Sequence, residues 1–210
     1  MKIKALCIAA AMACMAVQAQ AHFVLVSPAA SIVQNRQGDP QKIAPCGGVS
    51  ANPGRGSAAN PGVPSGAVTE IKGGSTFHLL VQETVFHPGH YRVALARTAA
   101  ELPADPKVTT RDSERGPWSV SADIQSPAAA PVIADGLFPH TERPTGLFEA
   151  DIPIPNVTCK NCLLQVIQFM AEHAKNADGD YSYHHCAVVN ITADPAKPAD
   201  ANWARLTTAR

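Results

Sequence analysis

The sequence predicts an all-β protein, an antiparallel β-sandwich of the immunoglobulin or fibronectin type with long loops. The chain has 18 prolines and 14 glycines among 210 residues, more than long helices tolerate. About seven short apolar runs are bounded by turn-forming residues, as strands are. The cysteine content also allows two disulfides, which are frequent in exported sandwich domains.

The first 21 residues are typical of an export signal. They contain Lys2 and Lys4, then an apolar stretch and the small-residue sequence Ala19-Gln20-Ala21, which is typical of a cleavage site. The apolar stretch is short for a membrane span and no second one follows. We therefore expect cleavage between Ala21 and His22 and a secreted or periplasmic protein. The predicted divisions are a signal peptide at 1–21, a β-sandwich domain at 22–193 and a C-terminal tail at 194–210.

The expected strands alternate with loops rich in turn residues. A first short strand at Phe23–Val26 precedes a turn-rich loop over residues 34–67. Residues 98–146 carry seven prolines and no sustained periodicity, so we expect a long excursion with one short strand. Loops of this length are often functional. The remaining expected strands are Val68–Lys72, Thr76–Glu83, Tyr91–Arg97, Trp118–Ile124, Leu147–Ile152, Leu163–Met170 and Cys186–Ile191.

The charge balance excludes two classes of partner. The chain has 17 basic and 17 acidic side chains, and loss of Lys2 and Lys4 would leave 15 basic ones and a net charge of −2. No basic stripe or polybasic patch is present, so we expect neither nucleic acid nor a membrane as partner. We expect a monomer.

Four cysteines remain once Cys7 and Cys14 leave with the signal. An even count in an oxidising compartment indicates two disulfides. The Cys-x-x-Cys sequence is also compatible with a redox motif or half of a zinc site, yet no second such sequence accompanies it. We favour one local and one long-range bridge, namely Cys159–Cys162 and Cys46–Cys186.

Cleavage after Ala21 would make His22 the new N-terminus, which is an unusual metal ligand. Its α-amine has a reference pKa near 8, so it can lose its proton near neutral pH. The amine and the ring nitrogen together can chelate one ion. A second histidine would complete a three-nitrogen set that suits copper. The alternative is that His22 merely starts a frayed chain end.

Partner histidines occur in two short segments at strand ends. His87 and His90 lie in one segment, and His184 and His185 lie in the other. Loop histidines are mostly solvated, and neighbours on a strand point to opposite faces. Four such residues beside an N-terminal histidine nevertheless indicate a metal site.

These residues resemble the copper-dependent lytic polysaccharide monooxygenases and their bacterial monooxygenase-like relatives. The resemblance covers most of the chain after residue 21, in order. The matching segments are His22-Phe23-Val24-Leu25 with Ser27-Pro28, Glu83-Thr84 with His87-Pro88-Gly89, Cys159-Lys160-Asn161-Cys162 with Leu164-Gln165-Val166-Ile167-Gln168, and Tyr183-His184-His185-Cys186-Ala187.

The resemblance implies that His22 and His87 form a histidine brace around one copper ion, with Tyr183 as the axial residue. It also implies that Cys46–Cys186 pins a loop to the last strand. His90 stands where fungal enzymes have a proline, and Tyr181 stands where they often have a glutamine. His90 and His185 are therefore alternative ligands, or donors that orient the first ligand.

The implied function is oxidative cleavage of glycosidic chains, with a polysaccharide substrate and an external electron donor. The first alternative is a non-catalytic brace protein for copper uptake or buffering, with a copper-delivery partner. A weaker alternative is a polysaccharide-binding module without catalysis.

Five further residues are weaker candidates. Glu83, Glu172 and His173 could transfer protons, although no carboxylate pair has a spacing that indicates hydrolysis. His140 could reach the copper face, but a solvated loop position is our preferred interpretation. Trp118 could stack on a sugar ring, and we prefer the role of a core or loop anchor.

Overall fold

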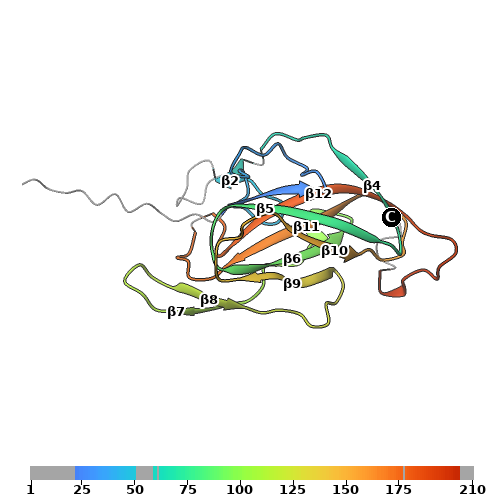
Figure 1. The fold of residues 1–210 in the computed structure, drawn as a ribbon. Helices are drawn as coiled ribbons and strands as arrows, with labels where there is room; N and C mark the ends of the chain where they lie inside the picture. Colours follow the sequence, from blue (N-terminus) through green and yellow to red (C-terminus); the bar gives the residue numbers. More distant parts are fainter. Residues whose placement is uncertain (1–21, 51–58, 61, 177, 204–210) are drawn as a thin grey trace, which may run out of the picture.

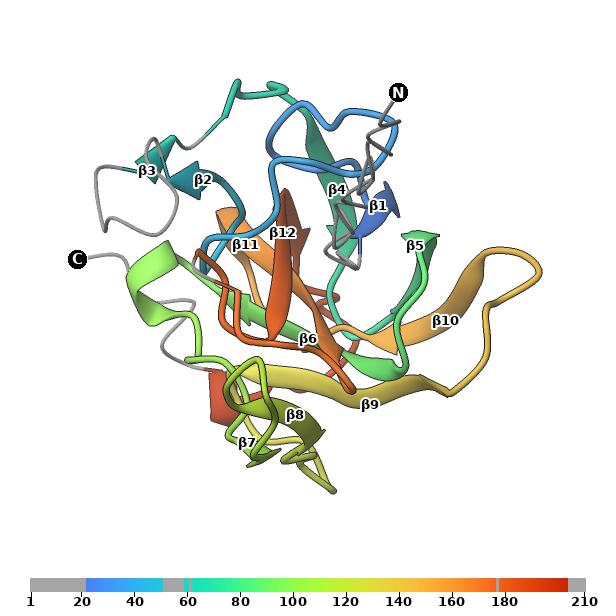
Figure 2. The same cartoon turned by 90° about the vertical axis from the view of Figure 1, so that its left-hand side faces the viewer.

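Two β-sheets form the body of the molecule in the computed structural model, which describes residues 22–50, 59–60, 62–176 and 178–203. The smaller sheet has the strand order β1-β5-β10, and the larger has the order β4-β12-β11-β6-β9. Apolar side chains from both sheets form one core, as in a β-sandwich. The predicted all-β sandwich with long loops is confirmed (Figure 1, Figure 2).

All strand pairs in the two sheets are antiparallel except β4 with β12, which is parallel. The smaller sheet contains β1 (His22–Ser27), β5 (Thr76–Val85) and β10 (Phe148–Pro153). The larger sheet contains β4 (Val68–Lys72), β6 (Gly89–Ala96), β9 (Val132–His140), β11 (Cys159–Met170) and β12 (Ser182–Thr192). The short elements are β2 (Val49–Ser50), β3 (Ala59–Asn60), β7 (Val108–Arg111), β8 (Trp118–Ala122) and the 3-10 helices η1 (Ala99–Glu101) and η2 (Ala201–Trp203).

Alternation of side chains explains how β5 fits the sandwich. Leu79 and Val81 are fully buried in the core, whereas His78 and Gln82 are exposed. Burial of each large apolar side chain contributes about 1.5–3 kcal/mol. The predicted strand at Thr76–Glu83 is therefore confirmed, and β5 continues to Val85, next to the candidate metal centre.

Residues 98–146 contain more structure than the sequence predicts. The region includes η1, β7 and the nine-residue strand β9 besides the expected strand β8. In β9 Gly136 and Phe138 have positive φ angles, and the pairing with β6 shifts register repeatedly. Such irregularities remove the two-residue alternation that identifies a strand in a sequence.

Both predicted disulfides are present. Cys46–Cys186 spans 140 residues and joins the loop after β1 to β12. Cys159–Cys162 is local and lies at the start of β11. Disulfides of this kind are typical of an oxidising compartment.

Parts of three predicted segments lie outside the described residues. These parts are the export signal 1–21, which includes Ala21 on one side of the predicted cleavage site, the stretch 51–58 of the turn-rich loop, and the end of the tail at 204–210. Within the predicted tail, Trp203 is 8% exposed and belongs to the hydrophobic core. Among the described residues, no helix has the length and apolar character needed to span a membrane.

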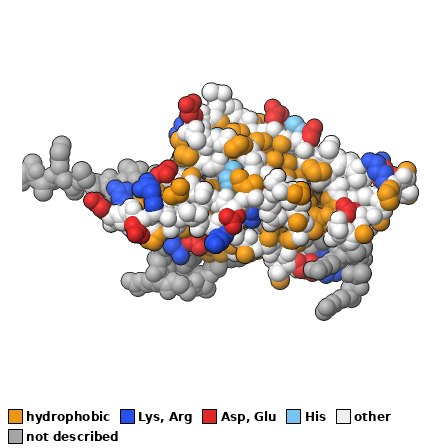
Figure 3. All heavy atoms as spheres, turned by 90° about the horizontal axis from the view of Figure 1, so that it is seen from below, with side chains coloured by type: hydrophobic (Ala, Val, Ile, Leu, Met, Phe, Trp, Pro, Cys, Tyr) orange, Lys and Arg blue, Asp and Glu red, His pale blue; other side chains and the backbone are white. Residues whose placement is uncertain are grey.

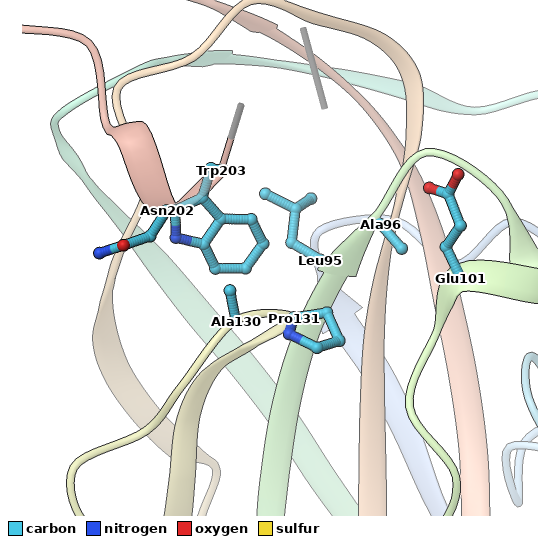
Figure 4. A pocket seen from close by; sticks show the side chains of 7 residues that line it. All are labelled: Leu95, Ala96, Glu101, Ala130, Pro131, Asn202 and Trp203. Carbon is cyan, nitrogen blue, oxygen red and sulfur yellow. The ribbon is translucent and has the colours of Figure 1, made fainter. Parts of the chain in front are cut away.

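A pocket of about 370 Å³ lies at one end of the sandwich, where β6 ends. The indole of Trp203, together with Leu95 and Pro131, forms its apolar wall, and Glu101 and Asn202 lie at its edge (Figure 4). On the face drawn in Figure 3, acidic and basic side chains are interspersed with apolar ones. His87 lies just before β6, and Leu95 and Ala96 at the end of this strand line the pocket. The pocket and the His87 turn therefore lie at opposite ends of β6.

Candidate metal centre

The pairing of β1 with β5 brings His22 next to the turn that carries His87. His22, the first residue of β1, is paired with Val85, the last residue of β5. His87 follows two positions later in the turn before β6. Both imidazoles are buried, with 3% and 5% of the residue exposed. The two predicted brace histidines are therefore neighbours, although 65 positions separate them in sequence (87 − 22).

Tyr183 reaches the same place from the other sheet. It lies near the start of β12, and its ring centroid is 5.2 Å from that of His22 in an edge-to-face arrangement. The side chain is fully buried, and its hydroxyl has no hydrogen-bond partner within the described part of the chain. Burial raises the pKa of this phenol well above its usual value, so Tyr183 is neutral at physiological pH.

Asp39 is a residue of this site that no pattern in the sequence indicates. Its Oδ1 lies 3.2 Å from His22 Nε2, and the hydrogen bond with His22 lowers the pKa of the carboxyl. The loop that carries Asp39 packs closely on β1, because Gly38 has a φ of 98° and approaches the Phe23 carbonyl too closely for any larger residue. The Phe23 amide also donates to Gln41 Oε1 at 3.1 Å. A single Asp in a polar loop gives no pattern by which it could have been predicted.

His87 presents a neutral imidazole. Its Nδ1 is buried without a hydrogen-bond partner among the described residues. Burial lowers the pKa to about 4, with further contributions from the charges of His173 and His22. Near neutral pH the ring therefore keeps the lone pair that a metal ion requires.

Glu83 stabilises the turn that carries His87. Its carboxylate is almost fully buried and accepts hydrogen bonds from the His87 backbone N–H at 3.2 Å and from Gln168 Nε2 at 2.7 Å. A third contact joins its Oε1 to His140 Nε2 at 3.2 Å. This carboxylate positions the turn and its side chain is only 1% exposed, so the geometry does not favour the proton-transfer role considered from the sequence.

His140 is therefore not the solvated loop residue that the sequence suggested. Its Nδ1 donates to the Phe138 carbonyl at 2.7 Å, and its Nε2 faces Glu83. Burial alone would lower the His140 pKa, but these hydrogen bonds outweigh it and raise the pKa. His140 supports the Glu83 carboxylate beside the candidate centre.

His173 also joins the group. Its ring centroid lies 4.7 Å from that of His87, and the residue is 7% exposed. The preceding residue, Glu172, does not enter the centre: it pairs with Arg111 at 2.6 Å and accepts the Trp118 indole N–H at 3.2 Å. Trp118 is thus a loop anchor, as preferred from the sequence.

The two alternative ligands occupy different places. His90 packs on Phe169, with ring centroids 5.2 Å apart, and lines a pocket with Val120 of β8. His185 lies under β1, where its Nε2 is 3.2 Å from the Phe23 carbonyl and burial lowers its pKa to about 4. Its contact with β1 suits a residue that orients His22. His184 points to the opposite face, where its Nε2 lies 2.8 Å from Asp105.

The donor set fits a copper ion bound through a brace. The described residues contain no preformed group of three or more His, Cys, Asp or Glu side chains for a metal ion. A brace takes only two side chains, because its third nitrogen is an α-amine. The buried, unpartnered Nδ1 of His87 and hydroxyl of Tyr183 are the kind of polar atoms that a bound group would satisfy.

The chain matches no known family model, and no curated protein matches its sequence.

Proposed function

We propose that the exported chain, processed to begin at His22, is a mononuclear copper protein that resembles a lytic polysaccharide monooxygenase and cleaves glycosidic chains by oxidation. The observation that carries the proposal is the convergence of His22, His87 and Tyr183, which come from three separate segments. The two disulfides support export into an oxidising compartment.

The orientation of the His22 ring supports chelation by the N-terminal residue. Its Nε2 faces Asp39 at 3.2 Å. A hydrogen bond from Nε2–H to a carboxylate leaves the lone pair on Nδ1, the ring nitrogen closer to the backbone. In the processed chain Nδ1 and the α-amine of His22 would then bind one ion together, and His87 would supply the third nitrogen.

Copper is the metal that this set favours. Two imidazoles and an amine suit copper, which heads the affinity series of the divalent first-row metals. When bound, copper would supply the redox chemistry by which oxygen or peroxide attacks a sugar C–H bond, given an external electron donor. The chain itself would orient the ligands, through Asp39 on His22 and Glu83 on the His87 turn, while neutral Tyr183 would exclude water from one side.

The test is the intact mass of the exported protein, measured apo and with one equivalent of Cu(II), followed by its electron paramagnetic resonance spectrum. We expect a mass that begins at His22, one tightly bound copper and a nitrogen-rich spectrum. His22→Ala should abolish tight binding, whereas His78→Ala, a change on the exposed face of β5, should not. An N-terminus other than His22, or no bound copper, would refute the proposal.

A second candidate function is copper uptake or buffering with a delivery partner, because the same brace would bind copper without a polysaccharide. The copper-loaded protein and a reductant should be incubated with chitin, cellulose and a soluble glucan. Oxidised oligosaccharides would support the enzyme, whereas their absence with ready copper transfer to an acceptor would support the carrier. Polysaccharide binding that survives both copper removal and His22→Ala would indicate a binding module instead.

A further inference from the structure

His90 is a buried histidine with two unsatisfied ring nitrogens. The residue is 7% exposed, and neither nitrogen forms a hydrogen bond with any part of the chain that the structure describes. The Ala122 carbonyl lies near the ring but outside hydrogen-bonding geometry. Buried polar side chains in native proteins almost always have a partner. A phenylalanine would fill the same space without this cost, so packing alone does not explain the imidazole.

The His90 ring borders a hollow of about 400 Å³, which is large enough for a small molecule. Phe169 of β11 packs on the ring, with centroids 5.2 Å apart. Val120 and Ile124 form part of the wall, and they are 42% and 50% exposed. A ligand with an apolar body can therefore cover apolar side chains that otherwise face solvent.

A bulge in β9 shapes the other side of the hollow. Two residues of β9, Phe138 and Pro139, stand opposite the single residue His90 of β6. Phe138 has a positive φ of 50°, and Pro139 lines the hollow. Bulges of this kind are frequent next to functional sites. More than half of the lining residues belong to the long 98–146 region, so this region builds most of the hollow.

The lining favours a neutral ligand with few polar groups. No Asp, Glu, Lys or Arg of the described chain lines the hollow, so a charged ligand would lose hydration without gaining a counter-charge. Burial lowers the pKa of His90, and the Asp135 charge opposes this only in part, so the ring is neutral near pH 7. A neutral imidazole offers one N–H donor and one lone pair, and a hydroxyl complements both. The many hydroxyls of a sugar would exceed these partners.

From these contacts we propose that the hollow binds a small neutral phenol, with its hydroxyl hydrogen-bonded to His90 and its ring against Val120 and Ile124. A small rotation of the imidazole brings a nitrogen to the hydroxyl. Pro88 and Gly89 also line the hollow, so the ligand lies beside the turn that carries His87. The site is distinct from the proposed copper centre, and the inference does not depend on that proposal.

Titration with phenol tests the inference. The exported chain, freed of metal by a chelator, should be followed by proton–nitrogen NMR. We expect saturable shifts at the amides of Val120, Ile124 and Phe169, with a Kd of about 1 mM or lower. Toluene lacks the hydroxyl and benzoate is charged, so both should bind at least about tenfold more weakly.

Two variants examine different parts of the site. His90→Phe keeps an aromatic ring on Phe169 and removes both nitrogens, whereas Val120→Lys places a charge in the exposed wall. We expect each change to weaken phenol binding at least about tenfold. Val26→Lys is the matched control and should bind as the wild type does, because Val26 is also a strand valine with 42% exposure but lies on β1.

The outcomes are separate from those for copper. A phenol titration without shifts at the hollow, or equal phenol affinity in Val120→Lys and Val26→Lys, would overturn the site. Toluene binding as tight as phenol binding, or unchanged affinity in His90→Phe, would overturn the role of His90 and with it the proposal. Val120→Lys and the toluene comparison decide the question even if His90→Phe does not fold.

Discussion

Nε2 of His22 lies 3.2 Å from Oδ1 of Asp39, so the first residue of β1 is held by a carboxylate from the following loop. The Asp39 loop is in turn held on the neighbouring strand, because Thr84 Oγ1 donates to the Gln37 carbonyl at 2.8 Å. This contact fixes the side of the ring from which a metal ion can approach.

Loss of the Asp39 carboxylate should weaken copper binding without removing a ligand. We expect Asp39→Ala to lower Cu(II) affinity about 10- to 100-fold, because partners behind a metal-binding histidine typically contribute this much. Chelator competition measures the change. Glu114→Ala, at an exposed loop acid, is the control and should leave affinity unchanged. Equal affinity in Asp39→Ala and wild type would show that the carboxylate does not orient His22.

The buried Glu83 carboxylate should matter for stability. Glu83→Gln removes the negative charge that interacts with the side chains of Gln168 and His140. We expect a loss of about 1–3 kcal/mol in the free energy of unfolding, because the buried side chains of Gln168 and His140 lose their strong hydrogen bonds to the carboxylate. Urea unfolding measures this loss, and the His140 pKa, followed by NMR, should fall.

Glu149→Gln is the matched control for this change. Glu149 is exposed and pairs with His78 at 3.1 Å, and surface pairs contribute little. A Glu83→Gln protein as stable as Glu149→Gln would argue against the proposed support of the His87 turn.

The sequence alone predicted the strands with clear alternation, because burial on one face imposes a period of two. It also predicted both disulfides, because an even number of cysteines remains in an exported chain. It missed β9, where Gly136 and Phe138 interrupt the alternation. At the candidate site the predicted cleavage pointed to His22, whereas the choice of His87 and Tyr183 came from the resemblance to the copper-dependent monooxygenases. No pattern indicates Asp39, because its role depends on how a loop docks on β1.

The apoprotein should lose stability in acid. His87 and His185 have pKa values of about 4 in the folded chain, below the usual 6.5, chiefly because both are buried. As pH falls from about 6.5 to about 4, the unfolded chain binds protons that the folded chain does not, so the free energy of unfolding falls by up to about 1.4 kcal/mol per pH unit for each histidine. His140 acts in the opposite direction, because its raised pKa favours folding below its unfolded pKa and this contribution is lost as pH rises.

Urea unfolding near pH 7, pH 5.5 and pH 4.5 tests this balance. We expect stability to decrease at each step, and His185→Gln to show a smaller decrease than wild type. If the free energy of unfolding were the same near pH 7 and near pH 4.5, burial of these two imidazoles would not be the source of acid sensitivity.

The long-range disulfide should affect both stability and copper binding. Cys46–Cys186 closes a span of 140 residues, and removal of such a native bridge typically costs about 2–5 kcal/mol. It also ties the segment after Asp39 to β12, so the Cys46→Ser, Cys186→Ser double variant should bind Cu(II) more weakly. The corresponding Cys159→Ser, Cys162→Ser variant is the control, because that bridge spans 3 residues and lies at the start of β11. Unchanged copper affinity in the first variant would show that backbone contacts, such as His184 N–H to the Gln41 carbonyl at 2.7 Å, suffice to hold the Asp39 loop.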